Sequence, residues 1–469
     1  MELTAERLNL YRFLTLKLAD DDLYPHYRYG ENFTLDEIKF FWRRTVKMIL
    51  DKKAPKKLGL YIHIPFCHQK CNYCMCDSYV PFSYGQVSEY LALLKKEIGY
   101  FSDLFKDVSF TSIYFGGGSP SFLRPVDLDN FLRFIYGSFS FSHDCQVIFE
   151  GTPTDLNEEY IDLLMRHGVN RFTIGVQSLD SKVIRNIKRP QTREKFVRIF
   201  KYLRKLGAPW INVDLIAGLE GQTKESFVSD VKLMLDLGVD MVHASGFSPL
   251  PHTPFSRQGK KFTLENERLR DEMMEAFEEI TKNNTGANAL EDGAGYKDGA
   301  ENLQETDLRK ENSSLLGIGY SAQSHAFAQA WYEHPCLTHL KKRPTYNKLP
   351  LFRGVRSSLK EEMIKFIYNN LQSGFSRRLF RSLFGMDATK VFKREFLLLS
   401  KLGKVNIKGD RIIFQVGPEH LIYSKIFYSK KRLRDILKIH GHSYRENKDY
   451  RKELERFYPE IYLSRENIG

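Results

Sequence analysis

Four of the six cysteines of this chain lie within one stretch of ten residues. They are Cys67, Cys71, Cys74 and Cys76, in a loop that directly follows the apolar run Leu58–Ile64. The first three have the spacing C-x3-C-x2-C, which supplies three thiolates to a four-iron cluster and leaves its fourth iron without a protein ligand. Ferredoxin-type runs supply a complete set of thiolates, as an electron carrier requires. An iron without a protein ligand can bind a substrate or cofactor directly, so the spacing favours an enzyme over an electron carrier.

Two other uses of clustered cysteines fit the sequence less well. Structural zinc usually takes paired C-x2-4-C ligands from two separated segments, and the remaining cysteines, Cys145 and Cys336, stand alone. A disulfide requires an oxidising compartment, and the N-terminal residues contain no apolar core of the signal-peptide type. We therefore interpret the loop as an iron–sulfur site.

The composition is typical of a soluble protein, and we expect a cytoplasmic location. A chain of 469 residues, 42% hydrophobic, is long enough for more than one domain with a sizeable core. No stretch approaches the ~20 apolar residues of a membrane span. The net charge is +13, with much of the excess near the C-terminus. Such an excess is usually a solvated basic surface, and we do not expect nucleic-acid binding.

From about residue 58 to 250, short apolar runs alternate with segments of helical spacing. This alternation predicts an α/β fold with a parallel sheet, open or nearly closed into a partial (β/α)6-type barrel. Such sheets place their chemistry at the carboxyl ends of the strands. The predicted strands are 58–64, 112–115, 147–150, 171–176, 210–217 and 241–245, and the helices include 87–100, 157–167, 192–206 and 223–237.

Polar or glycine-rich features follow or end successive predicted strands. The cysteine loop follows the first strand, and Gly116–Ser121 follows the second. Glu150 ends the third strand, Gln177 ends the fourth, and Asp214 interrupts the apolar run of the fifth. Because the carboxyl ends of parallel strands meet at one edge, we expect these groups to share a site.

These motifs together resemble the radical S-adenosylmethionine (SAM) superfamily. The segment Tyr61-Ile-His-Ile-Pro-Phe-Cys-His-Gln-Lys-Cys-Asn-Tyr-Cys-Met-Cys76 is similar to the oxygen-independent coproporphyrinogen III oxidase branch of that superfamily. The resemblance covers roughly residues 58–250. It is extended by four further segments, Phe115–Ser121, Gly175–Ser178, Ile187–Arg189 and Val213–Leu219.

The resemblance implies a [4Fe-4S] cluster held by Cys67, Cys71 and Cys74, with SAM chelating the open iron. Gly117 and Gly118 would bind the amino-acid end of SAM through their backbone, and Glu150 would accept hydrogen bonds from it. An electron from the cluster would cleave SAM to a 5′-deoxyadenosyl radical, which abstracts a hydrogen from the substrate. The cofactors would supply the chemistry, and the protein would supply positioning.

The same branch implies further binding residues, because its members can hold one or two SAM molecules. Tyr61 and Gln323 would lie near the first SAM. The second would be lined by Tyr73, Ser119, Gln177, Arg189 and Asp214, with Ser248 nearby. Cys76 matches a cysteine that does not bind the cluster. It is expected either to pass a hydrogen atom or proton to the substrate or to be a small buried hydrophobe.

Three functions remain open within this resemblance. The Cys76 pattern favours oxidative decarboxylation of porphyrinogen propionates. The segment 302–324 looks more like the class C radical SAM methyltransferases, cyclopropane-forming enzymes and heme-opening enzymes. Residues 175–180 look more like the heme-chaperone and methyltransferase lineages. The expected partners are a small-molecule substrate, a tetrapyrrole in the first hypothesis, and an electron donor such as flavodoxin or ferredoxin.

The sequence divides into four predicted regions. Residues 1–57 form an N-terminal helical extension, with a helix near 5–19. Residues 58–330 form the radical SAM core, with a polar insert at about 283–314 that is expected to act as a lid. Residues 357–415 predict three helices and a hairpin, which resembles a winged helix packed across the substrate cleft. Residues 416–469 form a basic tail.

Overall fold

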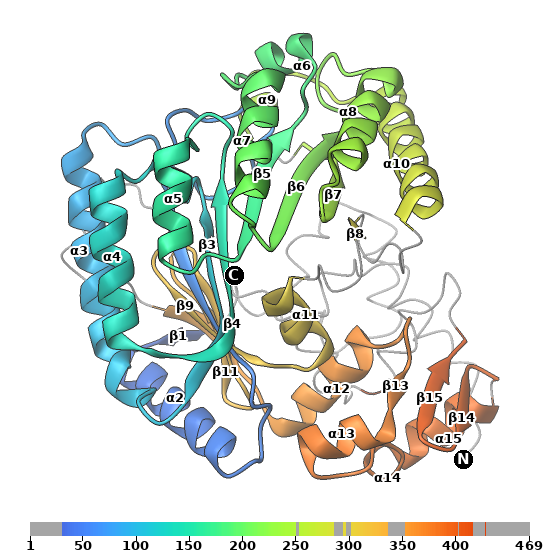
Figure 1. Ribbon diagram of the computed structural model, residues 1–469. Helices are drawn as coiled ribbons and strands as arrows, with labels where there is room; N and C mark the ends of the chain where they lie inside the picture. The colour runs from blue at the N-terminus through green and yellow to red at the C-terminus, as the bar shows by residue number, and fades with distance from the viewer. Residues whose placement is uncertain are drawn as a thin grey trace, which may run out of the picture.

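The computed structural model describes residues 31–249, 253–285, 294–296, 302–335, 352–401 and 403–415, together with Phe427 (Figure 1). Within these residues the centre is a sheet of 12 strands in the order β1-β12-β11-β10-β9-β2-β3-β4-β5-β6-β7-β8. The six strands predicted from the sequence are parallel neighbours in it, so the predicted α/β class is confirmed. They are β2 (Leu58–Ile64), β3 (Ser109–Gly117), β4 (Ser140–Gly151), β5 (Arg171–Gln177), β6 (Trp210–Ala217) and β7 (Met241–Gly246).

Helices between these strands cover the outer face of the curved sheet (Figure 1). Their ends follow local signals in the sequence. Asn157 caps one helix by accepting a hydrogen bond from the Tyr160 N–H (2.9 Å), and Gly238 ends another in the left-handed conformation, at φ 75°. The helices are α3 (Tyr84–Phe101), α4 (Pro125–Ser138), α5 (Glu158–Arg166), α6 (Ser181–Asn186), α7 (Arg193–Lys205) and α8 (Lys224–Leu237), with short 3-10 turns at Ser102–Leu104 and Pro120–Phe122.

A seventh parallel strand, β9 (Ser314–Ile318), pairs with the free side of β2 and was not predicted. Antiparallel strands extend the sheet beyond it, and α2 (Leu35–Leu50) packs there through a hydrogen bond from Trp42 Nε1 to the Tyr332 hydroxyl (2.6 Å). These strands are β10 (Gln323–Ala326), β11 (Ala330–Glu333), β12 (Phe352–Arg356) and β1 (Glu31–Phe33), and β8 (Ala294–Tyr296) closes the other edge against β7. The predicted helix at 5–19 lies outside the described residues.

The insert predicted as a lid is described only in part, since 286–293 and 297–301 lie outside the described residues. Its helix α11 (Leu303–Lys310) packs toward the amino ends of the strands, opposite the cysteine loop. Gln304 Nε2 donates to the Leu60 carbonyl (3.0 Å) and the Ser112 hydroxyl (3.3 Å), and the Leu303 N–H donates to Gln146 Oε1 (2.9 Å). Buried polar groups inside the sheet need such partners, so this helix packs against the strands, and the lid stays a prediction for the insert as a whole.

Residues 359–414 form a smaller unit with its own apolar cluster, which also includes Ile49, Ala54 and Phe327. Its two-stranded hairpin turns at Gly409 and is joined by a third short strand. The elements are α12 (Leu359–Asn369), α13 (Arg377–Phe384), α14 (Ala388–Val391), α15 (Lys393–Lys401), β13 (Phe375–Ser376), β14 (Val405–Lys408) and β15 (Arg411–Phe414). Apart from Phe427, which contacts Phe392 and Phe396, the predicted basic tail lies outside the described residues.

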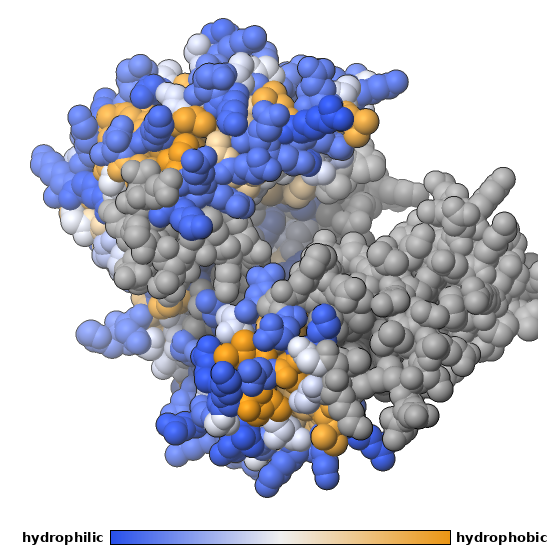
Figure 2. Space-filling view, turned by 90° about the vertical axis from the view of Figure 1, so that its right-hand side faces the viewer, coloured by the Kyte–Doolittle hydropathy of each residue, from blue (hydrophilic) through white to orange (hydrophobic). Residues whose placement is uncertain are grey.

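The face formed by α10 (Leu264–Thr285) and the smaller unit is mostly hydrophilic but carries apolar patches, one of them low on the smaller unit (Figure 2). A four-residue helix, α9 (Pro254–Arg257), precedes α10. Exposed large apolar residues of the smaller unit are Met386, Leu397, Ile407 and Ile413. Among the described residues, every helix is too short or too polar to cross a membrane.

Candidate active site at the carboxyl ends of the parallel strands

The cysteine loop is held to the strand ends by backbone hydrogen bonds. The Gly118 N–H donates to the Ile64 carbonyl (2.8 Å), and the Ser119 N–H donates to the Phe66 carbonyl (2.9 Å). Within the loop, the Cys67 N–H donates to the Tyr79 carbonyl (3.0 Å). These contacts depend on main-chain groups, so the position of the loop follows from the sheet itself.

The three cysteines of the C-x3-C-x2-C motif are half-buried and lie close enough to affect one another. Burial, and then the neighbouring Cys74 and Cys71, raise the pKa of Cys67 to about 12. A hydrogen bond with Cys76 is the main cause that lowers the pKa of Cys74 to about 6, with Lys70 nearby adding to the effect. Thiolates are the form that binds metal, so Cys67, whose pKa is raised, would release its proton on binding. The fit to an iron–sulfur cluster rests on three neighbouring thiol donors in one loop.

The geometry also separates a cluster from a single metal ion. No three His, Cys, Asp or Glu side chains among the described residues converge on a point where one ion would sit. In a four-iron cluster each thiolate binds a different iron, so a cluster does not require the three thiols to converge on one point.

The glycine turn after β3 is required by the packing of the protein on itself. Gly117 has φ +118°, and a Cβ there would lie 2.8 Å from the His63 ring. A Cβ on Gly118 would lie 2.7 Å from the backbone of Pro65, at the start of the cysteine loop. Only glycine fits these two positions, so the turn and the cysteine loop form one close-packed unit.

Glu150 faces this unit from the end of β4. Its Oε1 accepts a hydrogen bond from the Tyr114 hydroxyl (2.6 Å). Burial raises the pKa of Glu150 to about 7, the nearby Asp214 adds to the rise, and hydrogen bonds from Tyr114 and the Gly117 backbone oppose it. A cationic ligand beside this carboxyl group would favour its charged form.

Tyr61 lies on β2, two strands from Glu150, and the direction of its hydrogen bond is defined. The His63 ring is buried, which lowers its pKa to about 4, so the ring is neutral. Its Nε2 contacts the Asp77 carbonyl (3.2 Å) and must carry the proton, because a carbonyl only accepts. The other nitrogen, Nδ1, therefore accepts from the Tyr61 hydroxyl (3.1 Å). Glu150 and Cys76 both lie near enough to raise the pKa of Tyr61 beyond the effect of burial.

Arg189 is the centre of a second group of polar residues in the site, next to the cysteine loop and Glu150. Its Nη1 donates to the Tyr73 hydroxyl (2.7 Å), its Nη2 to the Gly175 carbonyl (2.5 Å), and its Nε to Gln191 Oε1 (3.1 Å). None of these partners is a carboxylate, and no ion pair joins Arg189 to an acid in the described part of the chain. The positive charge of the guanidinium is therefore not neutralised by a carboxylate, and an anionic ligand can bind to it.

Gln177 has an unusual backbone conformation at the end of β5. Its φ is 66°, and the pairing with β6 shifts register between Gly175 and Gln177. A non-glycine residue in this region is strained, and such strain clusters at functional sites. At this bulge the Gly175 carbonyl accepts the hydrogen bond from Arg189 Nη2.

Asp214 lies on β6 beside two residues that were not predicted. Asn212 Nδ2 donates to Asp214 Oδ1 (3.2 Å), and His243 Nδ1 lies 3.6 Å from the same oxygen. Asn212 Oδ1 is buried without a hydrogen-bond partner in the described structure. Alternation along β6 and β7 puts these three side chains on one face, and that spacing was the available signal.

Three predicted site residues make no described contact with Arg189 or Asp214. The Ser119 hydroxyl is buried and donates to Asp155 Oδ2 (3.1 Å). Ser248 is exposed after β7, and Gln323 is exposed at the start of β10. Near Gln323, the Ser321 hydroxyl donates to Asp77 of the cysteine loop, which ties the β9–β10 turn to the site and was not foreseen.

Residues 61–234 match the Radical SAM superfamily. The oxygen-independent coproporphyrinogen III oxidase of Salmonella typhimurium is 32% identical over 205 residues, which span 44% of this chain and 45% of that enzyme. This chain thus matches less than half the length of that relative. The enzyme of the same name from Helicobacter pylori is 29% identical over 390 residues, 78% of this chain and 83% of that one.

Among solved structures, the coproporphyrinogen III oxidase (HemN) of Escherichia coli aligns with a TM-score of 0.67 and 22% identity. The alignment covers 81% of this chain and 93% of that one. It shows that the two proteins share a fold.

Proposed function

Because residues 61–234 match the Radical SAM superfamily, we propose that this chain is an enzyme that uses a [4Fe-4S] cluster and SAM to act on a small-molecule substrate. Within this class, we propose the oxidative decarboxylation of porphyrinogen propionate side chains. One observation carries the proposal. Three neighbouring thiols, a carboxyl group of raised pKa and an arginine without a described acidic partner meet at one end of the sheet.

Cys67, Cys71 and Cys74 would hold the cluster, and Cys76 would not. When bound, the cluster and SAM supply one-electron chemistry at the substrate. The protein's part is to hold the loop in place through the backbone bonds of Gly118 and Cys67. Such thiols stay reduced in the cytoplasm, which we propose as the compartment.

The first SAM would lie between the glycine turn and Glu150. The Gly117 and Gly118 backbone would face its amino-acid end, with Tyr61 and Gln323 beside it. Glu150 would lose its proton as the cationic ligand arrives, because a nearby positive charge lowers the pKa of a carboxyl group. The Tyr114 hydroxyl fixes the orientation of that carboxyl.

The arginine half would bind a carboxylate, either of a second SAM or of a substrate propionate. Arg189 is preoriented by Tyr73, Gly175 and Gln191, so little side-chain freedom is lost on binding. Gln177, Asp214, Ser119 and Ser248 are the other residues we propose for a second SAM.

Cys76 would act on the substrate as a relay for a proton or hydrogen atom. Its side chain is exposed, and its hydrogen bond with Cys74 keeps it protonated by raising its pKa. Cys76→Ser is expected to retain the cluster absorbance and to lose most turnover. Full turnover of that variant would remove Cys76 from the proposal.

The decisive experiment is an anaerobic assay of the reconstituted protein with dithionite, SAM and coproporphyrinogen III, read by mass spectrometry. Loss of carbon dioxide from the porphyrinogen together with 5′-deoxyadenosine would support the proposed reaction. Deoxyadenosine with unchanged porphyrinogen would reject this substrate and keep the enzyme class. S-adenosylhomocysteine would favour methyl transfer. Stoichiometric heme binding without SAM cleavage would favour a heme chaperone.

A further inference from the structure

The cysteine loop is bonded directly to the end of α6. The Asn72 N–H donates to the Ile187 carbonyl (3.3 Å), and Asn72 Nδ2 donates to the Asn186 carbonyl (2.7 Å). On the other side of Cys71, Gln69 Nε2 donates to the Lys188 carbonyl. The residues on either side of Lys70 and Cys71 are thus hydrogen-bonded to the last residue of α6 and the two residues that follow it.

The same short segment carries three exposed cations, Lys182, Arg185 and Lys188. Lys182 and Arg185 are three residues apart on α6, so they lie on adjoining turns of the helix, and Lys188 follows just after the end of α6. In the described part of the chain no carboxylate forms an ion pair with any of them. The acids nearby are already engaged, since Asp180 caps α6 and Glu220 pairs with Lys260 (2.5 Å).

We propose that Lys182, Arg185 and Lys188 form the docking surface for a small acidic protein that carries one electron at a time. This inference rests on the proposed cluster, whose chemistry consumes electrons that must come from outside the chain. We name these three residues the α6 basic edge.

The first reason is the length of the path from this edge to the proposed cluster. Cys71 is joined by one peptide bond to Asn72, and Asn72 by one hydrogen bond to Ile187, the neighbour of Lys188. Electron transfer weakens steeply with distance and passes better through bonds than through gaps. A carrier seated on the edge would therefore lie at the end of a short bonded route.

The second reason is charge. Unpaired cations around a docking point attract an acidic partner over a Debye length and speed its encounter. Their complementarity fixes the orientation of the complex more than its total affinity. A carrier must also leave after each electron, and a small charged contact suits that better than a large apolar one.

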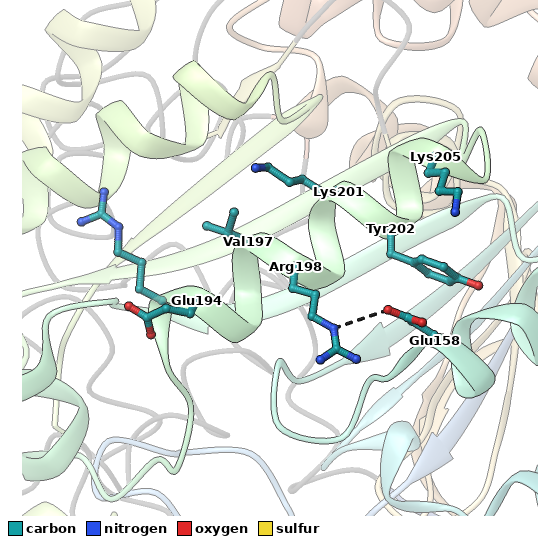
Figure 3. A pocket seen from close by; sticks show the side chains of 8 residues that line it. Glu158, Glu194, Val197, Arg198, Lys201, Tyr202 and Lys205 are labelled. Carbon is teal, nitrogen blue, oxygen red and sulfur yellow. Dashed lines mark ion pairs between the residues drawn. The ribbon is translucent and has the colours of Figure 1, made fainter.

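A second basic surface, on helices α5 and α7, can be compared with the α6 basic edge (Figure 3). The groove between α5 and α7 has a volume of about 630 Å³ and is lined by Arg193, Arg198, Lys201 and Lys205, among others. Arg198 faces Glu158 across it at 3.4 Å, so part of its charge is neutralised. No hydrogen bond joins the described residues of α7 to the cysteine loop. This groove is cationic but has no direct bonded route to the cluster.

The test compares charge reversal at the two surfaces. One variant combines Lys182→Glu, Arg185→Glu and Lys188→Glu, and the matched control combines Arg198→Glu, Lys201→Glu and Lys205→Glu. Flavodoxin, an acidic flavoprotein, is the probe. Its binding to the cluster-free chain is measured by calorimetry at low and high salt. The α6 variant is expected to bind about tenfold more weakly at low salt and to lose the salt dependence, and the control to stay within about twofold.

A second measurement distinguishes a loss of docking from a loss of the cluster. Bleaching of the cluster absorbance by reduced flavodoxin should slow about tenfold in the α6 variant, while bleaching by dithionite should match the unaltered protein. Equal effects of the two variants, or unchanged binding and bleaching in the α6 variant, would overturn the docking surface. A protein that dithionite cannot bleach at all would instead overturn the cluster proposal, and the binding data would still decide the surface.

Discussion

The two halves of the candidate site are held in place by different kinds of contact. On the cluster side, main-chain hydrogen bonds and two close-packed glycines fix the cysteine loop against the strands. On the arginine side, Arg189 is placed by side chains and carbonyls from separate elements, beside a strained Gln177. The first half is placed mainly by main-chain groups and close packing at the strand ends, whereas the second is placed mainly by polar contacts of one side chain. Substitutions should therefore act on the two halves in different ways.

The largest expected effect is the loss of the cluster. Cys71→Ala should abolish the visible absorbance of the reconstituted protein and all SAM cleavage, because two remaining thiolates cannot replace the third. Cys145→Ala is the matched control, since Cys145 is buried in β4 away from the loop. Retained absorbance in Cys71→Ala would refute the assignment of the cluster ligands.

The next effect is on folding of the cluster side. Gly118→Ala places a Cβ 2.7 Å from the Pro65 backbone, which cannot move aside as a side chain would. Overpacking of this kind costs about 1–3 kcal/mol, and urea denaturation should show it. Gly137→Ala has no atom within 4 Å of the new Cβ, and it lies in α4. That control should gain about 0.5–1 kcal/mol. Equal stability of both variants would mean that the glycine turn is not packed as described.

Arg189 also forms a hydrogen bond with the Cys71 thiol. Because Arg189→Lys leaves a positive charge beside that thiol, this change on the arginine side should still allow the cluster to form. Arg189→Lys keeps the charge but cannot reproduce the three bonds to Tyr73, Gly175 and Gln191. We expect full cluster absorbance with turnover reduced about 10- to 100-fold, measured as kcat/KM for SAM and substrate separately. Arg193→Lys, on the exposed start of α7, is the control. Loss of the cluster in Arg189→Lys would mean that Arg189 is needed to hold the cluster. It would contradict the view that the two halves respond to substitution in different ways.

The contrast also explains what could be predicted from the sequence. The cysteine loop, the glycine turn and Glu150 are local signals at strand ends, and the six parallel strands follow from alternation of patterns. The strand β9 could not be placed, because nothing in a five-residue run tells which strand it will join. His243 and Asn212 were missed for the same reason, since their role depends on lying beside Asp214.

The position of α11 within the predicted insert could not be foreseen from composition. A polar, glycine-rich insert usually lies on the surface, but α11 carries Gln304 to buried polar groups of β2 and β3. Inward-facing Ser112 and Gln146 required partners at the amino ends of the strands, and their need is visible only once the sheet is formed. The composition of the insert therefore did not predict its position, because that position depends on which buried polar groups of the sheet need hydrogen-bond partners.

The smallest expected effect concerns Glu150, which belongs to the cluster side but is placed by the assembled sheet. Its pKa of about 7 is above its usual value of 4.5, so between these values the folded chain keeps a proton that the unfolded chain releases. Stability must then fall as the pH rises through this window, and Glu150→Gln should remove that loss. A pKa of about 7 against 4.5 corresponds to at most about 3 kcal/mol at pH 8. Because Glu150 is partly exposed to solvent, we expect urea denaturation without cofactors to show the variant more stable than the unaltered protein by about 1–2 kcal/mol at pH 8 and nearly equal at pH 4.5. Glu89→Gln, at an exposed position of α3, should show no such pH-dependent gain. A variant with no advantage at pH 8 would mean that Glu150 is already well solvated, and the acid that awaits a cationic ligand would have to be sought elsewhere in the site.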